Sequence, residues 1–357
     1  MNLTGIGTFL IVLGVLVLFH EFGHFIVARF CGVQVLTFSL GFGPKIISRK
    51  WGATEYCISS VPLGGYVRLL GDDPNEPVAP ELKDQSFLEK GFLKKAAIVL
   101  AGPAFNLILA LLIFVGVFIH GVPSPTSDVG EVQAGSAAEK GGLKPSDKIV
   151  EIESAPILHW EEIREAIQKQ GGRSLHVTVE RAGSRVALQM TPTHLETTDL
   201  LGDPLSLWVI GVSPKGTYTT QKYGLFKATY MGAARTWEMM VLNMKGIVRM
   251  ITGKISSDNI GGPILIAQMA GKQAAEGVMS VLLFMAVISI NLGIINLFPI
   301  PILDGGHLLF FIIEAIIGRP LSLKTREVTQ QIGLALIVSL MVFAFYNDIM
   351  RIFVKPS

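Results

Sequence analysis

Four long apolar segments, separated by more polar stretches, dominate the pattern of the chain. Each is long enough to cross a bilayer, since a transmembrane helix needs about 20 apolar residues. The segments are Leu3–Phe30, Ala96–Ile119, Val281–Leu303 and, approximately, Val328–Met350. A further apolar run, 308–317, is too short to span and contains Glu314, so we expect a partly buried or interfacial helix there.

The connections between these segments have their own patterns. Residues 31–95 combine Gly and Pro breaks with short β-prone runs, which predicts hairpins that dip toward the membrane. The region from Gly121 to about Gly277 is the only sizeable water-soluble part. Its pattern predicts strands at 130–133, 148–152, 175–181 and 185–191, and helices at 136–140 and 159–169. Residues 226–250 are amphipathic, which favours an interfacial helix, with a core-packing helix as the alternative.

Composition agrees with a membrane protein that has one water-exposed portion. Half of the residues are hydrophobic and only 16% are charged, against about 25% in soluble domains. A net charge of +2 gives no reason to expect nucleic acid as a partner. Cys31 and Cys57 form no CxxC pair and imply no disulfide framework. Residues 1–19 contain no Lys or Arg and no small-residue cleavage site follows, so we expect a retained span, not a signal peptide.

The placement of basic residues predicts the orientation. Lys and Arg gather in the connection after the first segment and in the one between the third and fourth, but the N-terminal tail has none. Because positive loops stay in the cytoplasm, both termini and the soluble domain are expected outside. His20 lies about 17 residues into the first segment, hence near its cytoplasmic end at about 1.5 Å per residue.

The first segment carries the most unusual polar group, His20-Glu21-Phe22-Gly23-His24. Ionisable residues in a span are costly and usually functional. On a helix, positions i and i+4 share one face, so both histidines can bind one metal, and Glu21 can act as general base on a water molecule. Zn²⁺ in catalytic sites takes three protein ligands and keeps one open position.

A third ligand has to come from another segment. Asp304 follows two prolines that end the third segment, and its depth matches that of the two histidines. His307 is the competitor, and it could equally be an ordinary histidine at a helix start. Asn296 could bind a substrate backbone, although a hydrogen bond between helices would also explain it.

These motifs resemble the site-2 protease family of intramembrane zinc metalloproteases. The similarity rests on HEFGH in the first segment, NLFPIPILDGG (296–306) in a later one and AGPAFN (101–106) in the second. The order of elements resembles the bacterial regulator-of-sigma-E protease branch, with one PDZ-like unit where some members carry two. No G-L-G-F carboxylate-binding loop is visible, so a steric filter is as plausible as binding of C-termini.

The resemblance implies Zn²⁺ held by His20, His24 and Asp304, with Glu21 as the catalytic acid/base. It implies that Asn296, Pro299 and Pro301 line the substrate path and that Asn106 supports the site. Expected partners are the lipid bilayer and single-pass membrane substrates, such as anti-sigma factors or signal-peptide remnants, with no nucleic acid. The expected location is the bacterial inner membrane, with the active site near the cytoplasmic side.

The predicted fold is thus a polytopic α-helical membrane protein with four transmembrane helices, a membrane-associated β-hairpin region and one extracytoplasmic PDZ-like α+β domain. The predicted parts are transmembrane helix 1 (1–30), a β-rich cytoplasmic-side loop (31–95), helix 2 (96–120), the PDZ-like domain (121–195), a linker with an amphipathic helix (196–280), helix 3 with the LDG motif (281–306), a cytoplasmic-side connection (307–327), and helix 4 with the tail (328–357).

Two other function classes fit parts of the pattern. A non-catalytic PDZ scaffold would leave Glu21 and Asp304 in lipid without a purpose. An ion-coupled transporter would use these charges as a relay, but such proteins usually show internal repeats, and none is visible.

Overall fold

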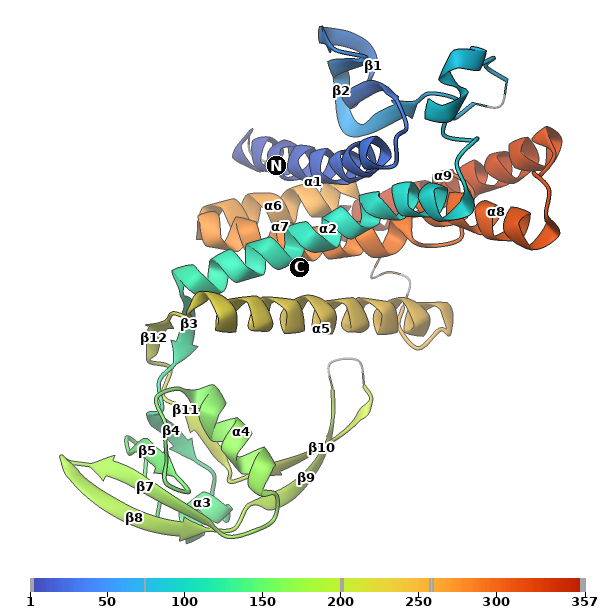
Figure 1. Ribbon diagram of the computed structural model, residues 1–357. Helices are drawn as coiled ribbons and strands as arrows, with labels where there is room; N and C mark the ends of the chain where they lie inside the picture. Colours follow the sequence, from blue (N-terminus) through green and yellow to red (C-terminus); the bar gives the residue numbers. More distant parts are fainter. Residues whose placement is uncertain (1–2, 74, 200–201, 257, 259, 354–357) are drawn as a thin grey trace. The chain divides into compact units, whose positions relative to one another are not determined.

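The computed structural model describes residues 3–73, 75–199, 202–256, 258 and 260–353 (Figure 1). The chain divides into two compact units. The helical unit contains the residues up to Val117 and those from Leu225 onward, and the β-rich unit is Phe118–Gly224.

Four helices of the described chain have the length and apolar composition to cross a bilayer. They are α1 (Leu3–Phe30), α2 (Phe92–His120), α7 (Val278–Asn296) and α9 (Leu323–Phe353). Helix α7 ends at Asn296, seven residues before the predicted end of the third segment. Pro299 and Pro301 lie in the turn that follows, where a proline ring cannot continue a helix. The chain resumes as α8 (Asp304–Ile317), so the LDG motif begins a separate helix.

Helix α6 (Pro263–Glu276) was not predicted, because its pattern is short and contains Gln268, Lys272 and Gln273. Its small residue Ala270 is fully buried in a cluster with Leu16 of α1 and Phe284 of α7. Helix α6 thus packs against α1 and α7 in the described structure. The packing is decided by small side chains that a hydropathy pattern does not reveal.

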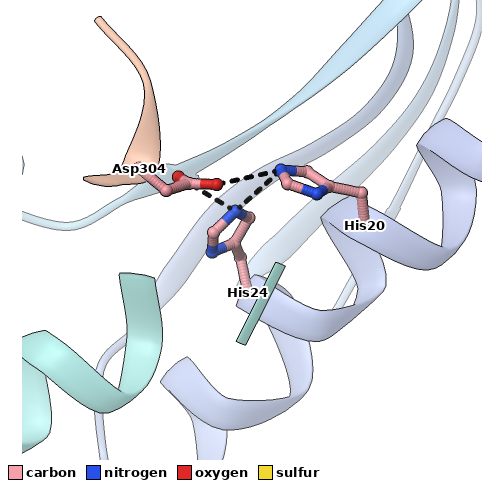
Figure 2. A group of neighbouring side chains, drawn as sticks. All are labelled: His20, His24 and Asp304. Carbon is pink, nitrogen blue, oxygen red and sulfur yellow. Dashed lines mark hydrogen bonds and ion pairs between the residues drawn. The ribbon is translucent and has the colours of Figure 1, made fainter. Parts of the chain in front are cut away.

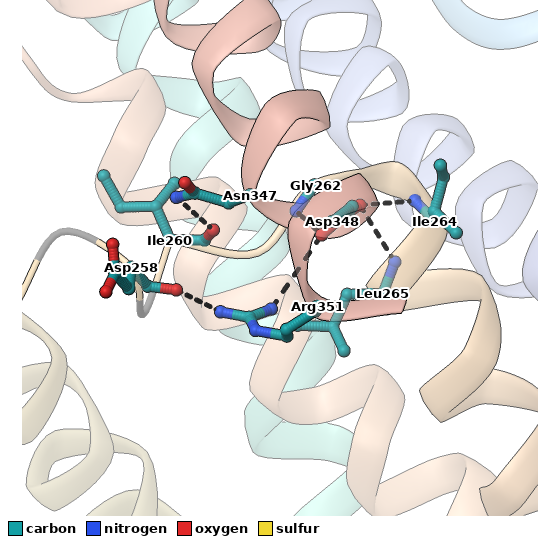
Figure 3. Close-up of polar contacts among 8 residues, drawn as sticks. All are labelled: Asp258, Ile260, Gly262, Ile264, Leu265, Asn347, Asp348 and Arg351. Carbon is teal, nitrogen blue, oxygen red and sulfur yellow. Dashed lines mark hydrogen bonds and ion pairs between the residues drawn. The ribbon is translucent and has the colours of Figure 1, made fainter. Parts of the chain in front are cut away.

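The N-terminus of α6 is capped by a residue of α9 (Figure 3). The N-cap Gly262 has no side chain to offer, and the first-turn N–H groups of a helix need acceptors. The Asp348 carboxylate accepts hydrogen bonds from the N–H groups of Gly262, Ile264 and Leu265 at 2.9, 3.0 and 3.1 Å. Asn347 Nδ2 donates to the Ile260 carbonyl at 3.2 Å. One turn of α9 therefore fixes where α6 begins.

The connection after α1 is a single long hairpin, β1 (Val35–Trp51) and β2 (Thr54–Leu69), which curls on itself. Residues 38–40 pair with 56–58 on one side and with 65–67 on the other. The base of β1 is buried with Phe25 and Ala28 of α1. Residues 42–51 of β1 are exposed, and 65–69 form an outer edge beside α1. A short 3₁₀ helix, η1 (Pro80–Gln85), precedes α2.

The β-rich unit contains a four-stranded sheet in the order β6-β5-β7-β8. Its strands are β5 (Lys148–Ile152), β6 (Ala155–Pro156), β7 (Leu175–Arg181) and β8 (Ser184–Met190). Three strand pairs complete the unit: β3 (Val122–Pro125) with β12 (Tyr218–Gln221), β4 (Val129–Val132) with β11 (Val212–Pro214), and β9 (Thr193–Thr198) with β10 (Pro204–Val209).

Two helices complete the core of this unit, α3 (Ala137–Lys140) and α4 (Trp160–Gln170). Ile163 and Ile167 of α4 pack with Val177 and Val179 of β7 in one buried apolar cluster. The predicted strands at 148–152 and 175–181 have these bounds in the structure. The pairs β9–β10 and β3–β12 were not predicted, because their residues are mostly exposed and lack a clear alternation.

Helix α5 (Leu225–Ile251) occupies the predicted amphipathic stretch. Its buried face consists of the small residues Ala228, Gly232 and Thr236. The large side chains of Phe226 and Trp237 are 92% and 67% exposed. The exposed side of α5 therefore offers aromatic surface of the kind that favours a membrane interface.

Candidate metal centre

His20, His24 and Asp304 come together from α1 and from the start of α8 (Figure 2). His20 Nε2 lies 3.2 Å from Asp304 Oδ2, and His24 Nε2 lies 3.4 Å from Asp304 Oδ1. The two Nε2 atoms are 3.3 Å apart. Ligand atoms of a tetrahedral zinc site with bonds of about 2.0–2.1 Å are themselves about 3.3 Å apart. The two histidines face one carboxylate oxygen each, and one ligand atom from each of the three residues lies within 4.8 Å of the other two, so the group has the composition and spacing to hold one Zn²⁺.

The histidine pair is placed by a close approach of α1 to α2. A side chain at Gly23 would put its Cβ 2.4 Å from the Ala101 carbonyl oxygen. A Cβ on Gly102 would lie 2.3 Å from His24 Nε2 and 2.8 Å from His20 Cε1. Both glycines are thus required by the space between the helices, and Gly102 leaves the room that the two imidazole rings fill.

Each imidazole is held through its second nitrogen by a group from α2. His24 Nδ1 donates to the Ile98 carbonyl at 2.8 Å, which leaves Nε2 free to bind a metal. Asn106 is fully buried, and its carboxamide lies 3.0 Å from His20 Nδ1. The atom at this distance is Nδ2, while the buried Asn106 Oδ1 has no hydrogen-bond partner among the described atoms. With a metal on Nε2, His20 Nδ1 carries the hydrogen and needs an acceptor, which Oδ1 of Asn106 supplies once the carboxamide is turned over, an exchange of O and N that also pairs the orphaned oxygen.

Asn106 is itself anchored to α7. Ser289 Oγ of α7 donates to the Asn106 carbonyl at 2.6 Å, and both residues are fully buried. Gly293 of the same helix packs close to the Pro103 carbonyl. The α2 segment that supports the histidines is therefore fixed from both sides.

Asp304 is positioned by the turn between α7 and α8. A Cβ on Gly305 would lie 2.3 Å from the Leu297 carbonyl oxygen, and one on Gly306 would lie 2.2 Å from that of Ile300. Gly333 of α9 makes a similar close approach to Pro301. The sequence Asp-Gly-Gly is therefore needed because the turn folds back against the first residues of α8.

The triad lines one side of a cavity of about 680 Å³. Glu21 also lines it, next to residues 65–67 of β2. A Cβ on Gly65 would lie 2.9 Å from Glu21 Cγ, so the outer edge of β2 passes directly beside this side chain. The Glu21 carboxylate, the three candidate metal ligands and a strand edge with no second partner among the described residues thus share one cavity.

The other residues predicted for the site have different places. Asn296 and His307 line the cavity, but His307 is not part of the group of potential ligands. Pro299 and Pro301 are not among the described residues that line it. The backbone of Pro301 packs against Gly306 and Gly333 instead, so in this structure it shapes the turn.

Sequence reasoning missed Gly102 and the Ile98 carbonyl. Small residues at 101–103 in an apolar helix are a signal for close helix packing, and this signal could have identified Gly102. A backbone carbonyl carries no signal in the sequence.

Comparison with known proteins adds the family. The model of peptidase family M50 matches residues 8–340. The chain belongs to peptidase family M50. A protein of Agrobacterium fabrum with the provisional name of a zinc metalloprotease is 40% identical, and the alignment covers 97% of this chain and 96% of that protein.

Two further M50 relatives are regulator of sigma-E proteases. Those of Salmonella typhimurium and Escherichia coli are 35% and 34% identical over 453 and 450 aligned positions. The alignments cover 98% and 97% of this chain and 99% and 98% of the relatives. Both alignments are longer than the 357 residues of this chain, so these relatives contain inserted residues that it lacks.

Family membership and the four apolar helices give the coarse identity of the protein. It is a zinc metalloendopeptidase of the M50, or site-2 protease, family and an inner-membrane protein with a β-rich domain. The predictions of zinc, of protease activity and of the family are confirmed.

Proposed function

We propose that this M50 peptidase cleaves single-pass membrane segments within the bilayer, with His20, His24 and Asp304 as the zinc ligands and Glu21 as the general base. The observation that carries the proposal is the triad, in which two imidazole nitrogens and a carboxylate oxygen from α1 and α8 lie within 4.8 Å of one another, the set of ligands that zinc accepts. Glu21 follows His20 directly in the chain and lines the same cavity.

The mechanism divides the work between the metal and the protein. His20, His24 and Asp304 would hold the zinc, which would supply Lewis-acid chemistry toward the scissile carbonyl and the attacking water. The Glu21 carboxylate takes a proton from the attacking water. It later gives that proton to the nitrogen of the leaving amine. Asn106 and the Ile98 carbonyl keep the two imidazoles oriented throughout.

The edge of β2 supports a path for the substrate. A peptide bond inside a helix is inaccessible, so the substrate must unwind, and its freed N–H and C=O groups need partners in lipid. The outer edge at 65–69 has no second strand among the described residues and borders the cavity. An extended substrate that pairs with this edge would satisfy its backbone and lie beside Glu21. Asn296 lines the same cavity, and we propose that its carboxamide binds the same backbone.

The substrates proposed are anti-sigma factors or signal-peptide remnants. Support comes from the relatives named as regulator of sigma-E proteases. In the proposed topology both termini and the β-rich unit are extracytoplasmic, and that unit acts as a PDZ-like filter that excludes bulky ectodomains. A cysteine introduced at the exposed Ser184 should react with an impermeant reagent on sealed cells; reaction only after lysis would contradict the topology.

Zinc content and proteolysis of purified variants test the assignment of the site. Glu21→Gln should abolish cleavage of a model single-pass substrate and keep the zinc. His20→Ala, His24→Ala and Asp304→Ala should each lower both zinc and activity. A His307→Ala variant should keep its zinc. Full zinc in Asp304→Ala, or parental cleavage by Glu21→Gln, would overturn the proposed roles.

A further inference from the structure

His307 is a largely buried imidazole in the catalytic cavity that the mechanism above does not use. It lies in the first turn of α8, three residues after Asp304, and lines the same cavity as His20 and His24. Residues three apart on a helix are neighbours on one face. The His307 ring therefore stands next to the carboxylate that completes the triad.

The ring of His307 has an unused hydrogen-bond donor. Its contact with Phe310 is edge-on, with ring centroids 6.4 Å apart and an angle of 87° between the planes. Among the residues that the structure describes, neither of its ring nitrogens has a hydrogen-bond partner. The side chain is partly exposed where it lines the cavity, so its N–H is available to whatever occupies the cavity.

The backbone that carries this donor is fixed before any substrate arrives. The backbone N–H of His307 donates to the Leu303 carbonyl at 3.2 Å. Gly305 and Gly306 pack tightly against the turn from Leu297 to Pro301, so the first turn of α8 has little room to move. A donor held in place in this way costs little reorganisation when charge develops in front of it.

Arg326, the cationic side chain that lines the cavity, is engaged through Nη2, and its buried Nε has no partner among the described atoms. Arg326 of α9 pairs with Glu314 of α8, and Glu314 also accepts the Leu321 N–H at 2.8 Å. The side-chain amides of Asn75, Asn296 and Gln330 also line the cavity. His307 is thus a free donor on the same helix turn as a proposed metal ligand.

We propose that His307 donates a hydrogen bond to the carbonyl oxygen of the scissile peptide as negative charge builds up there in the transition state. No bond to His307 forms or breaks, and its ring keeps its proton, while the transferred proton travels through Glu21. This role rests on the proposed function, since it needs a peptide carbonyl beside the triad.

Two substitutions separate a donor from a packing residue. His307→Phe keeps a planar ring against Phe310 but has no N–H, and His307→Gln keeps an N–H donor of similar reach. Zinc content should stay at the parental level in both variants. With a model single-pass substrate in detergent, kcat of His307→Phe should fall by about 10²–10³-fold with little change in KM. His307→Gln should recover at least part of this loss.

Ligand binding gives a readout that does not depend on turnover. A short hydrophobic peptide phosphinate, which carries a tetrahedral anion in place of the scissile carbonyl, should bind His307→Phe about 10²-fold more weakly than the parental protein. In a Glu21→Gln background the uncleaved substrate should bind with the same affinity whether residue 307 is His or Phe.

The other possible results of the kinetic, binding and zinc measurements each contradict the proposal in a different way. Parental kcat and phosphinate affinity in His307→Phe would overturn this inference and leave the proposed function intact. An equal loss of substrate and phosphinate affinity would make His307 a ground-state contact, and loss of zinc in both variants would make it part of the metal centre; either contradicts the proposal. Failure of the parental protein itself to cleave in a zinc-dependent manner would overturn the proposed function and this role with it.

Discussion

The Asp348 carboxylate near the end of α9 accepts the backbone N–H of Gly262, 86 residues earlier in the chain, at 2.9 Å. The carboxylate is 2% exposed and also accepts the N–H groups of Ile264 and Leu265. Because Gly262 has no side chain, α6 depends on another helix for its cap. The same α6 packs against α1, the helix that carries both histidines.

Asp348→Ala should therefore loosen the start of α6. It leaves three N–H groups without their acceptor, which should cost about 3 kcal/mol locally. Hydrogen–deuterium exchange of peptides covering 260–276 in the detergent-solubilised protein measures the effect. Ser339→Ala, at an exposed position of the same helix, is the control and should exchange like the parental protein. Unchanged protection in Asp348→Ala would contradict the capping role.

Gly102→Ala should damage the metal centre with a single methyl group. The new Cβ would lie 2.3 Å from His24 Nε2, a distance that forces the imidazole or the helix to move. Zinc bound per chain, measured by atomic emission on purified protein, should fall well below the parental value. Gly116→Ala on the same helix meets nothing within 4 Å and should keep its zinc. Equal zinc in the two variants would show that α1 and α2 can separate at little cost.

Asn106 should contribute to zinc affinity without touching the metal. Removal of an outer-shell partner of a metal-binding histidine typically costs about 10–100-fold in affinity. Asn106→Ala should show a loss of this size in a competition titration against a chelator of known affinity. Asn106→Asp retains an oxygen acceptor for His20 Nδ1 and should bind zinc more tightly than Asn106→Ala. If the aspartate variant binds no better than the alanine variant, the carboxamide acts through packing alone.

The β-rich unit should lose stability in acid through one ion pair. Asp147 is 1% exposed and accepts two hydrogen bonds from Arg181, at 2.8 and 2.7 Å, and one from the Lys144 N–H. Burial alone would raise the pKa of Asp147, but these hydrogen bonds outweigh it and lower the pKa below its usual value. The stabilisation is therefore complete above about pH 3.9 and is lost as the pH falls through the lower, folded-state pKa.

Arg181→Met should reverse this dependence. The guanidinium is about a quarter exposed, so its removal should lower stability at pH 7 by less than the loss of a fully buried partner would. Without its partner the buried Asp147 has a raised pKa, and the variant should gain stability as the pH is lowered. Exchange protection of peptides covering 175–190, corrected for the intrinsic rate at each pH, measures both trends. Arg185→Met, at an exposed position of β8, should follow the parental curve.

The sequence by itself determined the elements whose signals are local. Four apolar segments predict four long helices because hydropathy and length act within each segment. The spacing of His20 and His24 places both on one face because a helix repeats every 3.6 residues. Matching depth in the membrane was enough to favour Asp304 over His307 as the partner of these histidines, and the structure brings Asp304 to both.

Tertiary structure decided the features that depend on residues far apart in the chain. The hydrogen bond from His24 to the Ile98 carbonyl joins positions 74 residues apart, and the contact between Asn106 and His20 joins positions 86 apart. Helix α6 has too weak a pattern to be predicted, and it forms where Asp348 supplies its cap and α1 buries its alanine face. Such contacts arise from the packing of whole helices, in which glycines such as Gly102 fix the distance between backbones, and hydropathy along one segment carries no record of that packing.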